Sequence, residues 1–212
     1  VRYVAAVAPY YVRVDERELV DHFMALAEAS TVPLLLYDIP GNTGNPVTEE
    51  VLQAVLPHPN VVGVKDSTGN FSRFLRLVIA DSIAGTTGIR WIQGEDTLDV
   101  AALIAGAAGV VSGLSNVLPE PFVRLVRAVR GRDTATALAM QHVINTLHTI
   151  VRSTGKGVAP IRLALSQMGR GTRFLRSPAF SLGPEWDSVV RDAVESATEL
   201  YNRYSSDSPL KT

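Results

Sequence analysis

Short apolar runs alternate in the first half of the chain with segments that have the 3.6-residue periodicity of amphipathic helices. The apolar runs predict β-strands at residues 3–8, 33–37, 61–64, 91–93 and 109–112. The segments between them predict helices at residues 16–30, 48–56, 72–80 and 97–105. Because a helix joins each strand to the next, the strands are expected to run parallel and to be buried on both faces.

Strand–helix–strand units of this kind form either an open doubly wound sheet or a closed barrel. No Gly-x-Gly-x-x-Gly follows a strand and opens a helix, which disfavours a dinucleotide-binding fold. An eight-stranded barrel usually takes about 250 residues, whereas five strands are predicted here and the first begins at residue 3. The fold class is therefore α/β, as an open sheet or as a barrel whose first part is absent from this chain.

The strand pattern stops after Pro119, and helices are predicted at residues 120–129, 133–151, 159–168 and 184–204. We therefore expect two regions. Residues 1–128 form the sheet and its helices, and residues 129–212 form a helical C-terminal region.

The composition narrows the class of protein. Of the 212 residues, 46% are hydrophobic and 19% are charged, which predicts a folded domain with a sizeable core. The formal net charge of -1 argues against a nucleic-acid partner or an anionic membrane surface. The absence of cysteine excludes disulfides, zinc–thiolate sites and thiol nucleophiles. With no signal peptide visible, a cytoplasmic protein is the default expectation.

Residues 100–119 carry no charge and have the length of a membrane span. The stretch is rich in alanine and contains Gly106, Gly109 and Gly113. We therefore interpret it as a buried helix, a tight glycine turn and a buried strand.

Lys65 stands at the end of a buried strand. In a barrel, that position places the side chain at the mouth where active sites lie. Partial burial lowers a lysine pKa, and a neutral amine can attack a ketone to form an imine. A lysine that simply extends its charged end into water is the alternative, and position alone favours it.

Tyr37 ends the preceding strand, so its phenol is expected near Lys65, where it can transfer protons. Tyr10 and Tyr11 follow the first strand and are candidates for a proton relay, a subunit contact or plain packing. The loop at residues 40–44 has amides and a Thr43 hydroxyl that can hold a carboxylate, although turn chemistry alone explains its sequence. No two histidines have metal-ligand spacing in the strand region, so a metal-dependent aldolase is disfavoured.

Several motifs resemble the dihydrodipicolinate synthase / N-acetylneuraminate lyase family, in that family's order and spacing. They are PYY at 9–11, LLLYDIPGNTG at 34–44, VVGVKDSTGN at 61–70, QGED at 93–96 and GVVSGLSNV at 109–117. The resemblance covers essentially the whole chain. It implies a (β/α)8 barrel of which strands 4–8 are present here, followed by a C-terminal helical appendage.

The resemblance also implies roles for individual residues. Lys65 would form an imine with pyruvate, Tyr37 would transfer protons, and Tyr11 would reach a neighbouring subunit's site. The backbone carbonyl at Val111 would face the bound pyruvyl group. The remaining expected substrate contacts are Thr43, Gly94 and Asn42. No metal or other cofactor is implied, and a homo-oligomer, dimer or tetramer, is expected.

Two departures from the family pattern bear on the substrate. The synthase branch has an arginine where Asn42 stands. Asparagine lacks the positive charge and the paired N–H donors with which a guanidinium group binds a carboxylate. Asp38 replaces the commoner asparagine. Both changes favour an aldolase for 2-keto-3-deoxy sugar acids or hydroxy-oxo acids over a 4-hydroxy-tetrahydrodipicolinate synthase.

The given sequence begins at what would be the family's fourth strand, so it does not contain the family's early strands or its Thr-Thr loop. The string Gly85-Thr86-Thr87-Gly88 stands in the wrong place to be that loop. Since Val1 is not a natural initiator, we expect the chain to be a piece of a longer reading frame. The alternative to an active enzyme is a truncated, non-catalytic protein that binds pyruvate. The expected partners are pyruvate and an aldehyde, or the 2-oxo acid formed from them.

Overall fold

Five parallel strands form one sheet in the computed structural model, which describes residues 1–85 and 88–206. Their order in the sheet is their order in the chain, β1-β2-β3-β4-β5. The strands are β1 (Val4–Val7), β2 (Leu34–Asp38), β3 (Val61–Asp66), β4 (Arg90–Gln93) and β5 (Gly109–Val110). Each predicted strand is present, and β3 extends one residue beyond Lys65, to Asp66.

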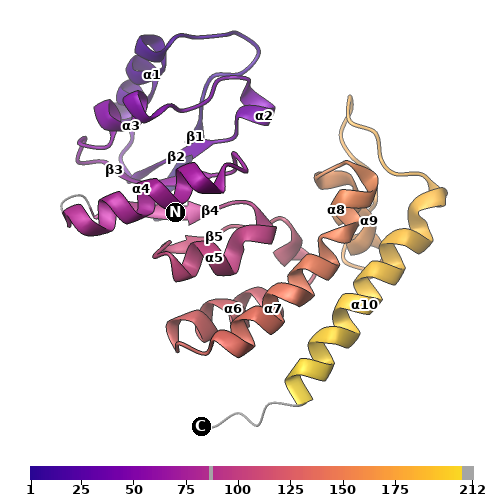
Figure 1. Ribbon diagram of the computed structural model, residues 1–212. Coiled ribbons are helices and arrows are strands. Elements are labelled where there is room, and N and C mark those ends of the chain that lie inside the picture. The colour runs from indigo at the N-terminus through magenta and orange to yellow at the C-terminus, as the bar shows by residue number, and fades with distance from the viewer. Residues whose placement is uncertain (86–87, 207–212) are drawn as a thin grey trace. The chain divides into compact units, whose positions relative to one another are not determined.

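At least one helix joins each strand to the next along the chain (Figure 1), and all of these helices except the short one at Pro40–Thr43 were predicted. They are α1 (Glu16–Ala29), α2 (Pro40–Thr43), α3 (Glu49–Val55), α4 (Phe71–Ala84) and α5 (Asp99–Ile104), with a 3-10 turn η1 (Asp96–Leu98) before α5. Side chains cap the first turns of α1 and α3. Asp15 and Glu18 form a capping box at α1, and Thr48 accepts a hydrogen bond from Val51 at the start of α3.

One face of the sheet carries the core. Leu34, Leu36, Val64 and Trp91 point to this face and pack against Phe23 of α1 and the buried side chains of α3 and α4. The other face of β2 and β3 is only partly buried at Leu35, Tyr37 and Lys65. The prediction that the strands are buried on both faces is thus wrong for this part of the chain. The helices cover only one face of β2 and β3. The opposite face, which carries Leu35, Tyr37 and Lys65, remains partly exposed within the first unit.

The uncharged stretch 100–119 has the predicted order of helix, turn and strand, but it is not fully buried, because Ile104 is 60% exposed and β5 is only partly buried. It contains most of α5, a turn with Gly106 at a φ of 108°, and β5. Within the described parts of the chain, no helix has both the length and the hydropathy to cross a membrane.

The second half of the chain is helical, and the chain divides into two compact units, 1–111 and 112–212. The second unit contains η2 (Leu114–Asn116), α6 (Glu120–Arg130), α7 (Thr134–Leu147), α8 (Thr149–Thr154), α9 (Val158–Gln167), η3 (Pro184–Trp186) and α10 (Asp187–Ser206). The division comes earlier than the expected boundary at 128/129, because α6 packs on α7. The single helix predicted at 133–151 is two helices, which meet at His148.

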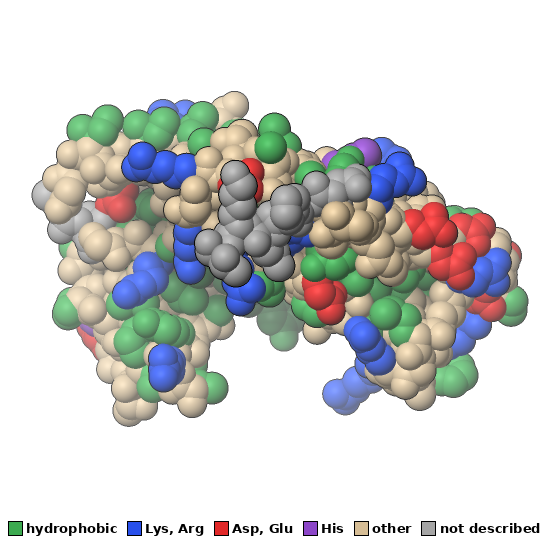
Figure 2. Space-filling view, turned by 90° about the horizontal axis from the view of Figure 1, so that it is seen from below, with side chains coloured by type: hydrophobic (Ala, Val, Ile, Leu, Met, Phe, Trp, Pro, Cys, Tyr) green, Lys and Arg blue, Asp and Glu red, His purple; other side chains and the backbone are tan. Residues whose placement is uncertain are grey.

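On the face shown in Figure 2, the described acidic and basic side chains form small groups with uncharged side chains between them. This distribution agrees with the nearly balanced formal charge of -1.

Candidate active site

Tyr37 and Lys65 lie side by side on neighbouring strands, both half-buried. Their Cα atoms are register partners in the β2–β3 ladder, and Lys65 Nζ lies 3.7 Å from the centroid of the Tyr37 ring. Two residues 28 positions apart in sequence thus meet near the carboxyl ends of parallel strands, the place where catalytic groups lie in barrels. The amine therefore lies over the face of the Tyr37 ring, in the geometry of a cation–π contact, with the phenol in its immediate neighbourhood.

Gly94 follows β4 and makes room for this pair. Its amide donates a 2.8 Å hydrogen bond to the carbonyl of Asp66, which brings its backbone against the end of β3. A Cβ at this position would collide with the hydroxyl of Ser67 and would lie 3.1 Å from Lys65 Cε. Gly94 therefore lets the chain approach Lys65 closely, and its predicted contact with a substrate stays a prediction.

We expect Gly94→Ala to lower any activity that depends on Lys65 by about tenfold or more, because the methyl group must displace Ser67 or Lys65. The measurement is turnover at saturating substrate. Gly109→Ala in β5 is the matched control, since a Cβ there meets nothing within 4 Å, and its turnover should stay within about twofold. Equal losses in both variants would contradict this role of Gly94.

The segment after β2 is the short helix α2 and not the predicted open loop. The Thr43 hydroxyl is buried and donates to the carbonyls of Ile39 (3.3 Å) and Asn45 (3.1 Å). It also accepts from the Asn45 amide at 3.3 Å. These bonds hold the turn itself, so the hydroxyl is engaged within the protein. The side chain of Asn42 is exposed.

Asn45 is a positioning residue for which the sequence carried no signal. It is buried, and its Nδ2 donates to the carbonyls of Pro9 and Val12 at 2.8 Å each. Its Oδ1 accepts from the Val14 amide at 3.2 Å. Asn45 thereby fixes the loop that presents Tyr10 and Tyr11.

Tyr11 has an exposed fraction of 99% and a φ of 78°, in the left-handed region that non-glycine residues seldom adopt. Tyr10 is also exposed, at 72%. Neither phenol packs into the first unit, so the tyrosines are not core residues. The predicted role of Tyr11 in a neighbouring subunit's site stays a prediction.

Behind the Tyr37–Lys65 pair lie two buried carboxylates. Asp38 and Asp66 are the next register partners in the same ladder and point to the helix-covered face. Arg73 of α4 binds both, at 3.0 and 3.2 Å. Burial raises the pKa of the Asp38 carboxyl above its ordinary value, an effect that hydrogen bonding to Val47 and the Arg73 charge oppose. The sequence departs from the family pattern at Asp38, whereas no sequence pattern marked Asp66 and Arg73 as its partners.

The segment after Gly94 carries three carboxylates, Glu95, Asp96 and Asp99. Asp99 opens α5 and is 1% exposed. Burial, and then the charges of Asp96 and Glu95, raise its pKa from 3.8 to about 8. Among the described residues, Asp99 Oδ2 has no hydrogen-bond partner. Asp99 is therefore a buried acid that is held largely uncharged near neutral pH.

The Val111 amide donates a 2.9 Å hydrogen bond to the Gln93 carbonyl and so extends the β4–β5 pairing. This places Val111 at the same edge of the sheet as Gly94. Whether its carbonyl faces a ligand stays a prediction. Thr86 and Thr87 of the Gly-Thr-Thr-Gly string lie outside the described residues.

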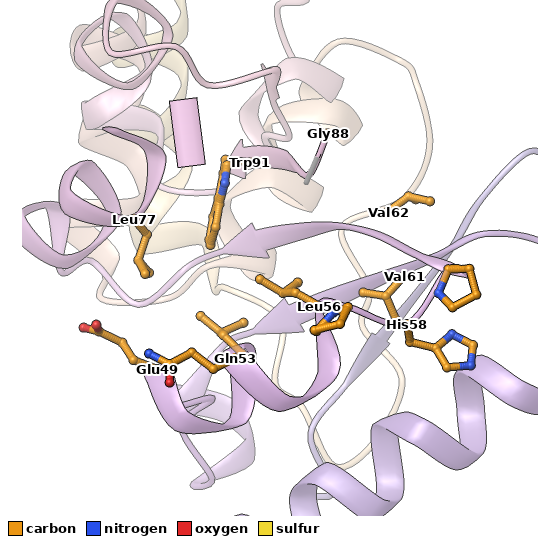
Figure 3. Close-up of a pocket in the computed structure, with 12 residues that line it drawn as sticks. Glu49, Gln53, Leu56, His58, Val61, Val62, Leu77, Gly88 and Trp91 are labelled. Atoms are coloured by element: carbon orange, nitrogen blue, oxygen red, sulfur yellow. The ribbon is translucent and has the colours of Figure 1, made fainter. Parts of the chain in front are cut away.

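A pocket of about 550 Å³ lies away from the Tyr37–Lys65 pair (Figure 3). Figure 3 shows Glu49, Gln53 and Leu56 from α3 and its end on one side, with Leu77 and Trp91 on the other. The lining is mainly apolar, and Glu49 is paired with Arg76. Since Val61 and Val62 at the start of β3 also line it, this pocket lies toward the amino ends of the strands, far along β3 from Lys65.

Known proteins resemble this chain over most of its length. Residues 1–197 match the dihydrodipicolinate synthetase family. The chain is 33% identical over 194 residues to the 4-hydroxy-tetrahydrodipicolinate synthase of Mycolicibacterium paratuberculosis, covering 92% of this chain and 62% of that protein. The chain thus spans less than two thirds of the length of this curated relative.

Solved structures share the fold. The 4-hydroxy-tetrahydrodipicolinate synthase of Methylacidiphilum fumariolicum SolV superposes with a TM-score of 0.86 at 27% identity, covering 95% of this chain and 66% of that one. The 2-keto-3-deoxygluconate aldolase of Sulfolobus solfataricus, in a variant form, superposes with a TM-score of 0.78 at 26% identity, covering 92% and 64%.

These likenesses confirm the predicted fold class, in which the five parallel strands are part of a (β/α)8 barrel and a helical region follows. The family match extends from β1 into α10. The chain belongs to the dihydrodipicolinate synthetase family.

Proposed function

We propose that this chain carries the Schiff-base site of a class I aldolase or lyase that acts on 2-oxo acids. The observation that carries the proposal is the Lys65 amine 3.7 Å from the ring centroid of Tyr37. Family membership supports it, because the named relatives are synthases and aldolases. The proposed enzyme needs no metal or other cofactor, since the lysine itself supplies the electrophilic iminium.

In the proposed reaction, Lys65 Nζ attacks the ketone carbon of a 2-oxo acid, and the carbinolamine loses water to give an iminium. In cleavage, the C3–C4 bond breaks and its electron pair moves through C3 to the iminium nitrogen, which leaves an enamine and releases an aldehyde. Protonation at C3 and hydrolysis then release pyruvate and restore the amine. Tyr37 takes the proton of the C4 hydroxyl as the bond breaks and transfers protons on the carbinolamine.

The direct test is reduction with borohydride in the presence of pyruvate, followed by intact-mass measurement and peptide mapping. The chain has three lysines, Lys65, Lys156 and Lys211, so the position of an adduct is easily assigned. A single reduced pyruvyl adduct on Lys65 is expected. Trapping only on Lys156, Lys211 or the α-amino group would overturn the proposal.

Tyr37→Phe is expected to lower turnover by about 10²- to 10³-fold, because the ring remains while the proton-transfer group is lost. The Lys65 adduct should still form, more slowly. Comparing turnover with the amount of trapped adduct separates the two effects. Tyr3→Phe, a change in an exposed tyrosine before β1, serves as the control. Wild-type turnover in Tyr37→Phe would exclude this role for the phenol.

We propose a 2-keto-3-deoxy sugar acid or a hydroxy-oxo acid as the substrate class. Asn42 supports this, because it offers no cation to bind a second carboxylate. A 4-hydroxy-tetrahydrodipicolinate synthase is the second candidate, which the name of the Mycolicibacterium relative favours. A panel of 2-keto-3-deoxy sugar acids, 4-hydroxy-2-oxoglutarate, N-acetylneuraminate, and pyruvate with aspartate semialdehyde discriminates between them.

An imine adduct without turnover on any member of that panel would instead support a non-catalytic pyruvate-binding protein.

We further propose that the protein acts as a homo-oligomer, a dimer or tetramer, in which the exposed Tyr11 contacts a neighbouring subunit. Sedimentation of the wild type and Tyr11→Ala would test that contact, since loss of a subunit contact weakens association.

A further inference from the structure

The ends of β2 and β3 are joined by a network on the face opposite to Tyr37 and Lys65. We name Asp38, Arg73 and Asp66 the carboxylate clamp. Arg73 Nη1 donates to Asp38 Oδ2 at 3.0 Å and to Asp66 Oδ2 at 3.2 Å. Because side chains alternate across a strand, the clamp stands directly behind the Tyr37–Lys65 register pair, one residue further along each strand.

The clamp also reaches the segments that flank the strands. Arg73 Nη2 donates to the carbonyl of Val47, and Asp38 Oδ1 accepts from the Val47 amide at 3.1 Å. Asp66 Oδ1 accepts from the amide and the hydroxyl of Thr68, at 2.9 and 2.8 Å. One guanidinium thus connects the ends of two strands, the turn before α3 and the first turn of α4.

The position of this network matters because Asp38 and Asp66 are the last residues of their strands. Beyond them, the β2–β3 ladder continues only through the hydrogen bond from the Ser67 amide to the Asp38 carbonyl, at 2.9 Å. Strand ends separate more easily than strand interiors, since fewer backbone bonds hold them. The planar fork of arginine can hold two carboxylates and a carbonyl at fixed separation, which a single ammonium group cannot do.

The clamp is shielded from water, which strengthens the attraction between Arg73 and the two carboxylates. Asp38 and Asp66 are each 1% exposed, and the Arg73 side chain is 15% exposed. By contrast, Arg76, one turn later on α4, pairs with Glu49 at the surface with 62% of its side chain exposed. The two arginines share a helix and differ in burial, so they form a natural pair for comparison.

We propose that Arg73 is a positioning residue that, by binding both strand-end carboxylates, holds Tyr37 against Lys65 and so sets the rate of imine formation. The proposal rests on the Schiff-base function argued above. Arg73 lies on the helix-covered side of the strands and contacts no substrate itself. Its loss therefore slows the covalent step more than it weakens the binding of pyruvate.

The test measures the rate of borohydride-trappable adduct formation in the purified protein, as a function of pyruvate concentration. Arg73→Lys is expected to lower the rate at saturating pyruvate by about 10²-fold, a loss typical of reacting groups displaced by about 1 Å. The half-saturating pyruvate concentration should change less than about threefold. Arg76→Ala should match the wild type within about twofold.

Chemical rescue distinguishes positioning from general stabilisation of the fold. In Arg73→Ala, millimolar methylguanidine should restore part of the rate, whereas urea at the same concentration should not. If this variant fails to fold, Arg73→Lys, measured well below its own melting temperature, decides the question. A folded Arg73→Lys protein that forms the adduct at the wild-type rate would overturn the clamp proposal.

The two proposals fail in different ways. A wild-type protein that forms no adduct on Lys65 overturns the Schiff-base function, and the role of Arg73 with it. A wild-type adduct on Lys65, together with an unchanged rate in Arg73→Lys, overturns the role of Arg73 alone. An equal rate loss in Arg76→Ala would also overturn it, because the effect would then not depend on the clamp.

Discussion

Replacement of Lys65 by methionine is expected to abolish the pyruvate adduct and to lower turnover on any 2-oxo acid substrate by about 10³-fold or more. Methionine keeps the length and most of the packing of the half-buried side chain and removes only the amine. Without that amine no iminium forms, and the electron pair of the breaking carbon–carbon bond has no acceptor.

Lys156→Met provides the matched control, because Lys156 lies in the helical second unit and is exposed. Its adduct yield and turnover should equal those of the wild type. Thermal unfolding of both variants shows whether Lys65→Met is folded. A folded Lys65→Met protein that keeps its turnover would exclude covalent catalysis by Lys65.

The second large expected effect is that the free energy of unfolding depends on pH through the buried carboxyl group of Asp99. Its pKa is raised from 3.8 to about 8 in the folded protein, so folding favours the protonated form. Its contribution to stability is therefore fully present below about pH 4 and is lost as the pH rises through about 8. In that window the free energy of unfolding should fall by as much as roughly 1.4 kcal/mol per pH unit. Above pH 8 the loss should level off.

Asp99→Asn removes the charge and should therefore stabilise the protein at pH 8, by as much as roughly 5 kcal/mol. That corresponds to a melting temperature about 10 to 20 °C higher. Denaturant unfolding between pH 4 and 9 measures the difference between variant and wild type, which should grow with pH. Asp21→Asn, at an exposed position on α1, should show no such growth. A constant difference for Asp99→Asn across this range would mean that Asp99 is charged throughout.

The alternation of apolar runs and amphipathic segments was enough to predict every strand and the main helices, because both periodicities are local properties of the chain. The same regularity placed Tyr37 and Lys65 at strand ends. Their direct pairing depends on a register shift between Leu34 and Leu35, because without that shift Tyr37 would stand opposite Val64. Sequence motifs also identified the family, which the comparisons confirm.

Other features of the site depend on contacts between segments that are distant in sequence. Arg73 and Asp38 are 35 residues apart, and Asn45 and Pro9 are 36 apart. Such pairs leave no periodic pattern, and their residue types are common in turns and at helix starts. The local sequence of the turn after β2 suggested that the Thr43 hydroxyl could hold a carboxylate, whereas tertiary packing buries that hydroxyl and engages it in hydrogen bonds within the turn.

The sequence by itself thus determined the fold class and the family, and it placed Tyr37 and Lys65 at the ends of consecutive strands, since these follow from local periodicity and sequence motifs. The tertiary structure decided that the two residues are register partners, because a register shift in the β2–β3 ladder aligns them. Only the tertiary structure decided which charges are buried. It placed Arg73 between two carboxylates, left Asp99 Oδ2 without a hydrogen-bond partner among the described residues, and kept one face of β2 and β3 partly open. Burial and electrostatic pairing depend on where distant segments pack, and no local pattern encodes that.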